Sequence, residues 1–267
     1  MTSSPIVVRV KKKRIIELLS SGKRVDGREP TEYREIQVES GVIERAEGSA
    51  RVRLGKTEVM VGVKIETGAP FPDVPDKGVL AVNVELVPLG SPAFEPGPPG
   101  EDAVELARVV DRGIRESKAI DLEKLCVEPG KNVFVVFVDV YVLNHDGNLI
   151  DASALAALAA LLNTKMFKYT VEDGEIKKQP GYTPLPMINY PVSVTFAKIG
   201  DKLILDAGFD EEQVMDTRLT MALDQDGSIC AIQKGGGSGY FTKEEILEAA
   251  KIALKKTEEL RKIVVKG

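Results

Sequence analysis

The chain has 267 residues, of which 43% are apolar and 29% charged, and a formal net charge of −5. This composition excludes a disordered chain, and the length allows one large domain or two smaller ones. A free-standing nucleic-acid-binding protein is usually basic, so any RNA contact has to come from a local basic patch or from a larger assembly.

Cys126 and Cys230 are the only cysteines, which argues against a disulfide scaffold and against a zinc cluster. The longest apolar run, Val133–Leu143, contains Asp139 and is too short to cross a bilayer. The basic cluster Arg9–Arg14 precedes no apolar segment long enough for a signal peptide. We therefore expect a cytoplasmic protein.

The first part of the chain combines two helices with several short strands. Apolar spacing predicts a helix over residues 11–21 and strands over residues 50–54, 58–66 and 79–87. A Pro- and Gly-rich stretch without regular structure follows the last of these strands. The second helix is expected over residues 101–118.

The second part repeats this plan of strands followed by a helix. An apolar strand from Val133 leads into a helix rich in Ala and Leu, and residues 181–191 are expected to form a linker. Thr242 and Glu245 form a capping box at the start of the last helix. Further strands are expected over residues 192–199, 203–205, 219–223 and 228–234. The sequence therefore predicts an α+β fold with mixed sheets and two similar halves, residues 1–185 and 190–267.

The turn between the Val133 strand and the Ala-rich helix is the most informative segment. A helix start presents unpaired N–H groups and a partial positive charge, both of which attract anions. Asp151 is expected at the N-cap, where its own carboxylate accepts those N–H groups and repels phosphate. Leu149 and Ile150 contribute no side-chain donors. The sequence therefore predicts a well-capped core helix and no phosphate site.

Several motifs occur in the order found in one known family. They are Lys23–Arg28, Gly48–Ala50, Gly55–Val59, the segment 105–121, the strand–turn–helix 133–163 and the segment 210–239. Together they resemble the RNase PH superfamily, the phosphorolytic exoribonucleases, over residues 20–255. The segments 105–121 and 210–239 are most similar to the ring subunits of the archaeal exosome that lack phosphorolytic activity.

The resemblance implies an RNase PH-like fold and a specific assembly. In active members the turn reads Asp-Gly-Gly-Ser/Thr-Arg, whereas here Asn148, Leu149 and Ile150 stand at the last three positions. The implied assembly is a hexameric ring, a trimer of heterodimers with a catalytic RNase PH-like paralogue. RNA-binding cap subunits sit on one face, and single-stranded RNA enters the channel. No membrane is involved, and phosphate and Mg²⁺ are expected at the partner's site rather than in this chain.

Arg108, Arg112 and Arg115 fall on one face of the predicted helix, because their positions lie within about 60° of one another. Arginine grips phosphate oxygens with paired donors and suits contact with an RNA backbone. The alternative is a salt-bridged surface, since three neighbour pairs are available: Glu105 with Arg108, Asp111 with Arg115, and Arg112 with Glu116. The resemblance implies that superfamily active-site arginines lie on this helix, which favours RNA contact.

A carboxylate cluster lies between two of the later predicted strands. Its members are Asp206, Asp210, Glu211, Glu212 and Asp216. Paired carboxylates can hold Mg²⁺ or act as acid and base. The spacing does not match the acidic pattern of active superfamily members, and Asp216 fits it best. The preferred interpretation is a polar turn, with no metal site and no catalytic residue.

Two further features carry alternatives. The Gly-rich segment 235–239 could cradle phosphate, but it lacks the P-loop spacing, so a turn that needs positive φ is the preferred interpretation. His145 is the only histidine, which makes a metal site or a histidine-based triad improbable and favours a residue at a strand end.

The functional prediction is a non-catalytic ring subunit of the archaeal exosome. Such a subunit binds and positions single-stranded RNA and completes the active site of a phosphorolytic 3′–5′ exoribonuclease paralogue. The alternative is a chain that is itself an active phosphate-dependent 3′–5′ exoribonuclease. That alternative requires a positive anion cradle at residues 146–151, where Asp151 stands with two apolar residues.

Overall fold

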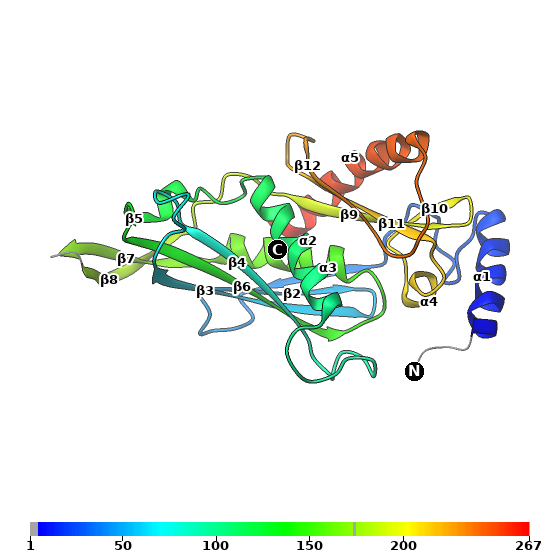
Figure 1. Ribbon diagram of the computed structural model, residues 1–267, viewed down its shortest axis with the longest axis horizontal. Helices are drawn as coiled ribbons and strands as arrows, with labels where there is room; N and C mark the ends of the chain where they lie inside the picture. The colour runs from blue at the N-terminus through cyan, green and yellow to red at the C-terminus, as the bar shows by residue number, and fades with distance from the viewer. Residues whose placement is uncertain (1–4, 173–174, 267) are drawn as a thin grey trace.

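The computed structural model describes residues 5–172 and 175–266 and shows a mixed α+β fold (Figure 1). The larger sheet has six strands, of which five follow the order β1-β2-β3-β6-β4, while β5 pairs with β6. Their bounds are β1 Ile36–Ser40, β2 Gly48–Leu54, β3 Thr57–Gly68, β4 Val79–Leu86, β5 Cys126–Glu128 and β6 Asn132–Asn144. Neighbouring strands are antiparallel except β4 and β6, which run parallel.

The smaller sheet is antiparallel and has the order β10-β9-β11-β12. Its strands are β9 Val192–Ile199, β10 Lys202–Leu205, β11 Thr217–Leu223 and β12 Ile229–Gly235. The short helix α4, Phe209–Glu212, lies in the connection between β10 and β11. This connection carries the carboxylate cluster, so the cluster forms part of a polar turn between two strands.

Helix α3, Leu149–Asn163, joins the two sheets because it packs against β2 and β3 on one side and β9 on the other. Eleven of its residues are buried, most of them Ala or Leu. Small side chains let the strands approach closely: a Cβ added at Gly48 would lie 2.5 Å from the carbonyl oxygen of Ala160. The main hydrophobic core is therefore one continuous cluster that spans both sheets around α3.

The remaining helices cover the outside of this core. Helix α2, Glu101–Glu116, packs on β4, and helix α5, Lys243–Lys266, packs on β9 and β11. Helix α1, Pro5–Ser20, lies at the end of the molecule opposite to the β7–β8 hairpin (Figure 1). A 3₁₀ turn, η1, spans Glu123–Leu125. The predicted α+β class is confirmed. The predicted capping box is also confirmed, because the Glu245 N–H donates to the Thr242 hydroxyl over 3.2 Å.

The expected linker was wrong in its first part, residues 181–184. Residues 181–191 were expected to be a linker, but β8, Glu175–Pro184, extends into them and pairs with β7, Lys165–Glu172. Aromatic packing holds this hairpin to the larger sheet: the Phe134 ring lies 5.7 Å from that of Phe167 and 5.0 Å from that of Tyr169. The division into residues 1–185 and 190–267 stays a prediction.

Candidate functional site

Helix α3 begins with Asn148 as its N-cap, so the expectation of Asp151 at this position was wrong. Asn148 has left-handed backbone angles, φ 52° and ψ 50°, and its side-chain oxygen accepts the Asp151 N–H over 3.4 Å. Gly147 supplies a second positive φ of 89° and leaves no room for a side chain, because a Cβ there would lie 2.5 Å from the carbonyl oxygen of Ala207. The helix therefore begins at Leu149, and its N-cap lies three residues before Asp151.

Asp151 instead turns into the interior and ties α3 to the smaller sheet. Its carboxylate accepts hydrogen bonds from the Tyr33 hydroxyl at 2.6 Å and from the Thr195 hydroxyl at 2.7 Å. The Thr195 N–H and the Asn148 side-chain amide donate to it at 3.0 Å and 2.9 Å. Burial raises the pKa of Asp151 to about 6, although these donors oppose the rise.

Glu212 on α4 is the carboxylate that closes the start of α3. The backbone N–H of Asn148 donates to Glu212 Oε1 over 2.8 Å. Burial raises the pKa of Glu212 to about 7, while Arg218 and Arg34 act in the opposite direction. A donor that a bound anion would need is therefore already paired within the chain.

The space in front of this helix start is small and acidic. A cavity of about 200 Å³ is lined by Asp102, Glu105 and Glu212, together with one cation, Arg218. Arg218 is not free, because its guanidinium lies 2.6 Å from the Glu105 carboxylate. An anion entering this cavity would meet more negative than positive charge, which disfavours phosphate.

Asp206, which is itself fully buried, organises a second ionic cluster beside the same turn. Its carboxylate accepts from Arg28 Nη1 at 2.9 Å, from Arg34 Nη2 at 2.7 Å and from the Asn148 side chain at 2.8 Å. Burial alone would raise the pKa of Asp206, but the bonds and charge of Arg34 hold it below its usual value. Residues 28–34 are thereby fastened to the turn that starts α3.

The other carboxylates of the cluster also have partners inside the chain. Glu211 forms a buried pair with Arg24, whose Nε lies 2.9 Å from Glu211 Oε1. Asp210 accepts from Lys11 at 2.7 Å, and Asp216 pairs with Lys12. Among the residues that the structure describes, no group of three or more His, Cys, Asp or Glu is arranged to hold a metal ion.

The α2 arginines differ from one another. Arg115 is held in place, because its Nε and Nη2 lie 2.9 and 2.6 Å from the Asp111 carboxylate and Nη2 also donates to the Leu80 carbonyl over 2.9 Å. The pKa of Arg115 rises mainly through its hydrogen bonds to Asp111. Only this one of the three possible neighbour pairs on α2 is present within the described residues.

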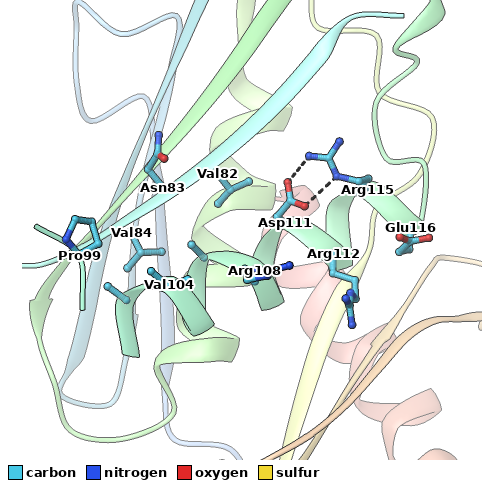
Figure 2. Close-up of a pocket in the computed structure, with 12 residues that line it drawn as sticks. Val82, Asn83, Val84, Pro99, Val104, Arg108, Asp111, Arg112, Arg115 and Glu116 are labelled. Atoms are coloured by element: carbon cyan, nitrogen blue, oxygen red, sulfur yellow. Dashed lines mark hydrogen bonds and ion pairs between the residues drawn. The ribbon is translucent and has the colours of Figure 1, made fainter. Parts of the chain in front are cut away.

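Arg108 and Arg112 are exposed, and within the described part of the chain neither takes part in a hydrogen bond or an ion pair. Both line a groove of about 450 Å³ between α2 and strand β4, whose walls include Val82, Val84 and Val104 (Figure 2). Figure 2 shows the two guanidiniums apart from the joined Asp111 and Arg115 side chains. The groove thus offers two unpaired arginines beside an apolar wall.

The two remaining features are structural. Gly236 and Gly237 have φ of 59° and 61°, and a Cβ at Gly237 would lie 2.2 Å from the carbonyl oxygen of Asp216, so the predicted positive-φ turn is confirmed. His145 directly follows β6 and packs between two aromatic rings, Phe94 at 5.7 Å and Phe209 at 5.2 Å. Burial lowers the pKa of His145.

Comparison with known proteins agrees with this geometry. The 3′ exoribonuclease family, domain 1, matches residues 32–166, and domain 2 of the same family matches residues 189–256. The chain belongs to the 3′ exoribonuclease family. The predicted resemblance to the RNase PH superfamily is confirmed, and with it the RNase PH-like fold.

Several proteins similar to this chain are archaeal exosome proteins. The exosome complex component Rrp42 of Thermococcus gammatolerans is 58% identical over 269 residues, covering 100% of this chain and 98% of that protein. A solved Archaeoglobus fulgidus exosome with RNA bound to the active site contains a chain that is 47% identical, with a TM-score of 0.88, over 96% of this chain and 98% of that chain. A chain of a solved archaeal exosome core is 43% identical, with a TM-score of 0.85, over 97% and 98%.

Sequence reasoning missed the charged network around α3. Glu212 and Asp206 were grouped as a polar turn, and Arg24, Arg28 and Arg34 were given no role. Arg24 and Arg28 lie in the Lys23–Arg28 motif, so their conspicuous spacing was a signal, but their partners lie far away in the sequence. No helix among the described residues is long and apolar enough to cross a membrane.

Proposed function

We propose that this chain is a non-catalytic ring subunit of an exosome, in which it binds single-stranded RNA and completes the active site of a catalytic paralogue. One observation carries the proposal: the start of α3 is closed by Glu212, while Arg108 and Arg112 remain exposed and unpaired. At the start of α3 the donor that could hold the attacking phosphate is therefore paired within the chain, whereas α2 presents free donors suited to an RNA backbone. The names of its relatives support its membership of an exosome complex.

The proposed role of α2 is electrostatic positioning. Arg108 and Arg112 contact phosphates of the RNA near the partner's active site, and Arg115 contributes less because Asp111 holds its guanidinium. Phosphate then attacks the terminal 3′ linkage in the partner's site, the bond to the last nucleotide breaks, and a nucleoside diphosphate leaves. Phosphate and Mg²⁺ belong to the partner in this scheme, and no residue of this chain is a catalytic residue.

The proposed assembly is the ring that the family resemblance implies. The chain alternates with the catalytic paralogue in a hexameric ring, RNA-binding cap subunits sit on one face, and the complex works in the cytoplasm. The two kinds of interface in such a ring differ from each other, because each subunit presents two different surfaces to its neighbours.

The alternative, an independently active phosphorolytic enzyme, is tested by assaying the isolated chain and the mixture. With poly(A), phosphate and Mg²⁺, the isolated chain should release no ADP, whereas the chain mixed with its paralogue should be active. Release of ADP by a preparation free of the paralogue would overturn the non-catalytic role. Light scattering of the mixture tests the ring, and a chain that stays monomeric beside its paralogue contradicts it.

A further inference from the structure

Positive charge is concentrated at the beginning of this acidic chain. Residues 1–24 contain seven Lys or Arg and one Glu, a net charge of +6, whereas the whole chain has a net charge of −5, which leaves −11 for the remainder. Five of the seven cations lie on helix α1. Such asymmetry within one chain is typical of a segment that meets a polyanion.

Some of these cations are needed to hold α1 in place. Ile15 and Leu19 are buried against a small cluster of the smaller sheet that includes Ile199 and Ile204. At the edges of this apolar stripe, Lys11 lies 2.7 Å from the Asp210 carboxylate and Lys12 pairs with Asp216. Arg24 is buried with Glu211. The attachment of α1 therefore uses three of the seven cations.

The other four cations have no such role. Arg9, Lys13, Arg14 and Lys23 are exposed, and none has a hydrogen bond or ion pair to a side chain within the described residues. At 100° per residue, Arg9, Lys13 and Arg14 lie on the side of α1 away from Ile15 and Leu19. Glu17, the one acidic residue of α1, lies on the same side and is also exposed. We name Arg9, Lys13 and Arg14 the α1 basic face.

Resting on the proposed function, we propose that the α1 basic face is a second binding surface for the phosphate backbone of single-stranded RNA, separate from Arg108 and Arg112. Three cations and one acidic residue, Glu17, share this side of α1, so it keeps a net charge of +2 that no ion pair within the described residues neutralises. A phosphate backbone neutralises such charge without any requirement for base sequence. Helix α1 lies at one end of the molecule and α2 near its middle, so a strand that reaches both surfaces must be extended (Figure 1).

The test compares two triple variants in the complex assembled with the catalytic paralogue. The first reverses the α1 basic face: Arg9→Glu, Lys13→Glu and Arg14→Glu. The matched control reverses three exposed α5 lysines that also lack ion pairs in the described residues: Lys251→Glu, Lys255→Glu and Lys262→Glu. Both variants change the net charge equally, so a difference between them reports position. Affinity for long and short poly(A) is measured over a range of salt concentrations.

We expect the α1 variant to assemble normally, to bind long poly(A) about tenfold more weakly, and to show a log–log salt slope about 2 smaller in magnitude, because three phosphate contacts are lost at about 0.7 each. Short poly(A) held by Arg108 and Arg112 should bind as before. An equal loss of poly(A) affinity in the α5 control would show that the effect comes from net charge alone and would overturn the proposal. Loss of assembly would show that the face meets an acidic protein surface instead, which also overturns it.

The same experiment separates this inference from the proposed function. If the unmodified complex binds RNA and the α1 variant binds it equally well, only the second surface is refuted. If Arg108→Glu with Arg112→Glu leaves RNA affinity unchanged while the α1 variant weakens it, the α2 role is refuted and the α1 surface stands.

Discussion

Helices α3 and α2 both carry donors that suit an anion, and the chain uses them in opposite ways. At the start of α3, the Asn148 N–H is paired with Glu212 and the Asn148 side chain is paired with Asp206. On α2, Arg108 and Arg112 are exposed and have no partner within the described residues. One helix has its donors satisfied by the chain itself, and the other leaves them for a ligand.

This difference shows how carboxylates of the chain itself can occupy donors that would otherwise bind an external anion. A carboxylate from the same chain is always present at high effective concentration, so it excludes an external anion from any donor that it reaches. The exposed arginines gain no stability from the fold, and a solvated pair would contribute little in any case. Their presence is therefore better explained by binding than by folding.

The largest effect is expected at the closed region, from Asp206→Asn. The substitution leaves the guanidiniums of Arg28 and Arg34 beside a neutral side chain in the interior. Breaking a buried ionic cluster in this way costs about 3–5 kcal/mol of unfolding free energy. Urea unfolding measures the loss. The control is Asp210→Asn, an exposed partner of Lys11, where a change of about 0–1 kcal/mol is expected. Equal losses would contradict the structural role of Asp206.

A smaller, pH-dependent effect on the unfolding free energy is expected for Glu212→Gln. Because the folded-state pKa of Glu212 is raised to about 7 from 4.5, its contribution to stability is present below pH 4.5 and is lost as the pH rises through 7. Glu212→Gln keeps an acceptor for the Asn148 N–H and removes the titration. We expect the variant to gain about 2 kcal/mol relative to the unmodified chain between these pH values.

Unfolding free energies of both proteins, measured across this pH range, check the prediction. Asp151, with a pKa raised to about 6, titrates in both proteins, so its own contribution cancels in the difference apart from its coupling to Glu212 through their shared partner Asn148. Glu248→Gln makes the same chemical change at an exposed side chain of α5 and serves as the control. A difference that does not vary with pH would show that Glu212 is ordinarily solvated.

The open region is tested by Arg108→Glu with Arg112→Glu in the assembled complex. We expect RNA affinity to fall about tenfold for any sequence, with a salt slope about 1.4 smaller in magnitude, because two phosphate contacts are lost. Turnover should fall as well, whereas the melting temperature should change little, since neither arginine has a partner within the described residues. A lowered melting temperature with unchanged RNA affinity would reduce α2 to a salt-bridged surface.

The smallest effect is expected at Arg115, which is intermediate between the two regions. Its guanidinium is exposed but already bonded to Asp111 and to the Leu80 carbonyl. Arg115→Ala should therefore destabilise the chain by about 0.5 kcal/mol and weaken RNA binding less than Arg112→Ala does. Thermal unfolding and RNA titration of the two single variants measure both quantities. A larger RNA effect at Arg115 would reverse the order proposed for the three arginines.

Local patterns predicted most of the elements. The capping box at Thr242, the apolar run of β6 and the Ala-rich α3 are each specified by residues close together in the chain. The β7–β8 hairpin was not predicted, because its strands carry several lysines and depend on contact with Phe134 of the larger sheet. Periodicity detects a half-buried face only where burial is regular.

At the start of α3, the residue expected to cap the helix was wrong, and the RNA-binding role of the α2 arginines stays a prediction. The sequence indicated that Leu149 and Ile150 contribute no side-chain donors, but the N-cap was expected at Asp151, whereas it is Asn148. The residue that closes the helix is Glu212, whose distance from Asn148 along the chain is 64 residues. No local rule brings these two together, since their meeting depends on how the smaller sheet packs against α3. The pairing with Asp111 and the Leu80 carbonyl, which separates Arg115 from Arg108, is likewise seen only in the folded chain.

The ionic cluster around Asp206 also constrains the order in which segments of the chain can dock during synthesis. Arg34 leaves the ribosome 172 residues before Asp206, and Arg24 leaves it 187 residues before Glu211. The first sheet can pair while synthesis continues, but the segment that carries these arginines lacks its buried carboxylate partners until Asp206 and Glu211 have been made. Helix α1 therefore docks among the last elements, and a chain cut short before Asp206 leaves its N-terminal arm loose and strongly basic.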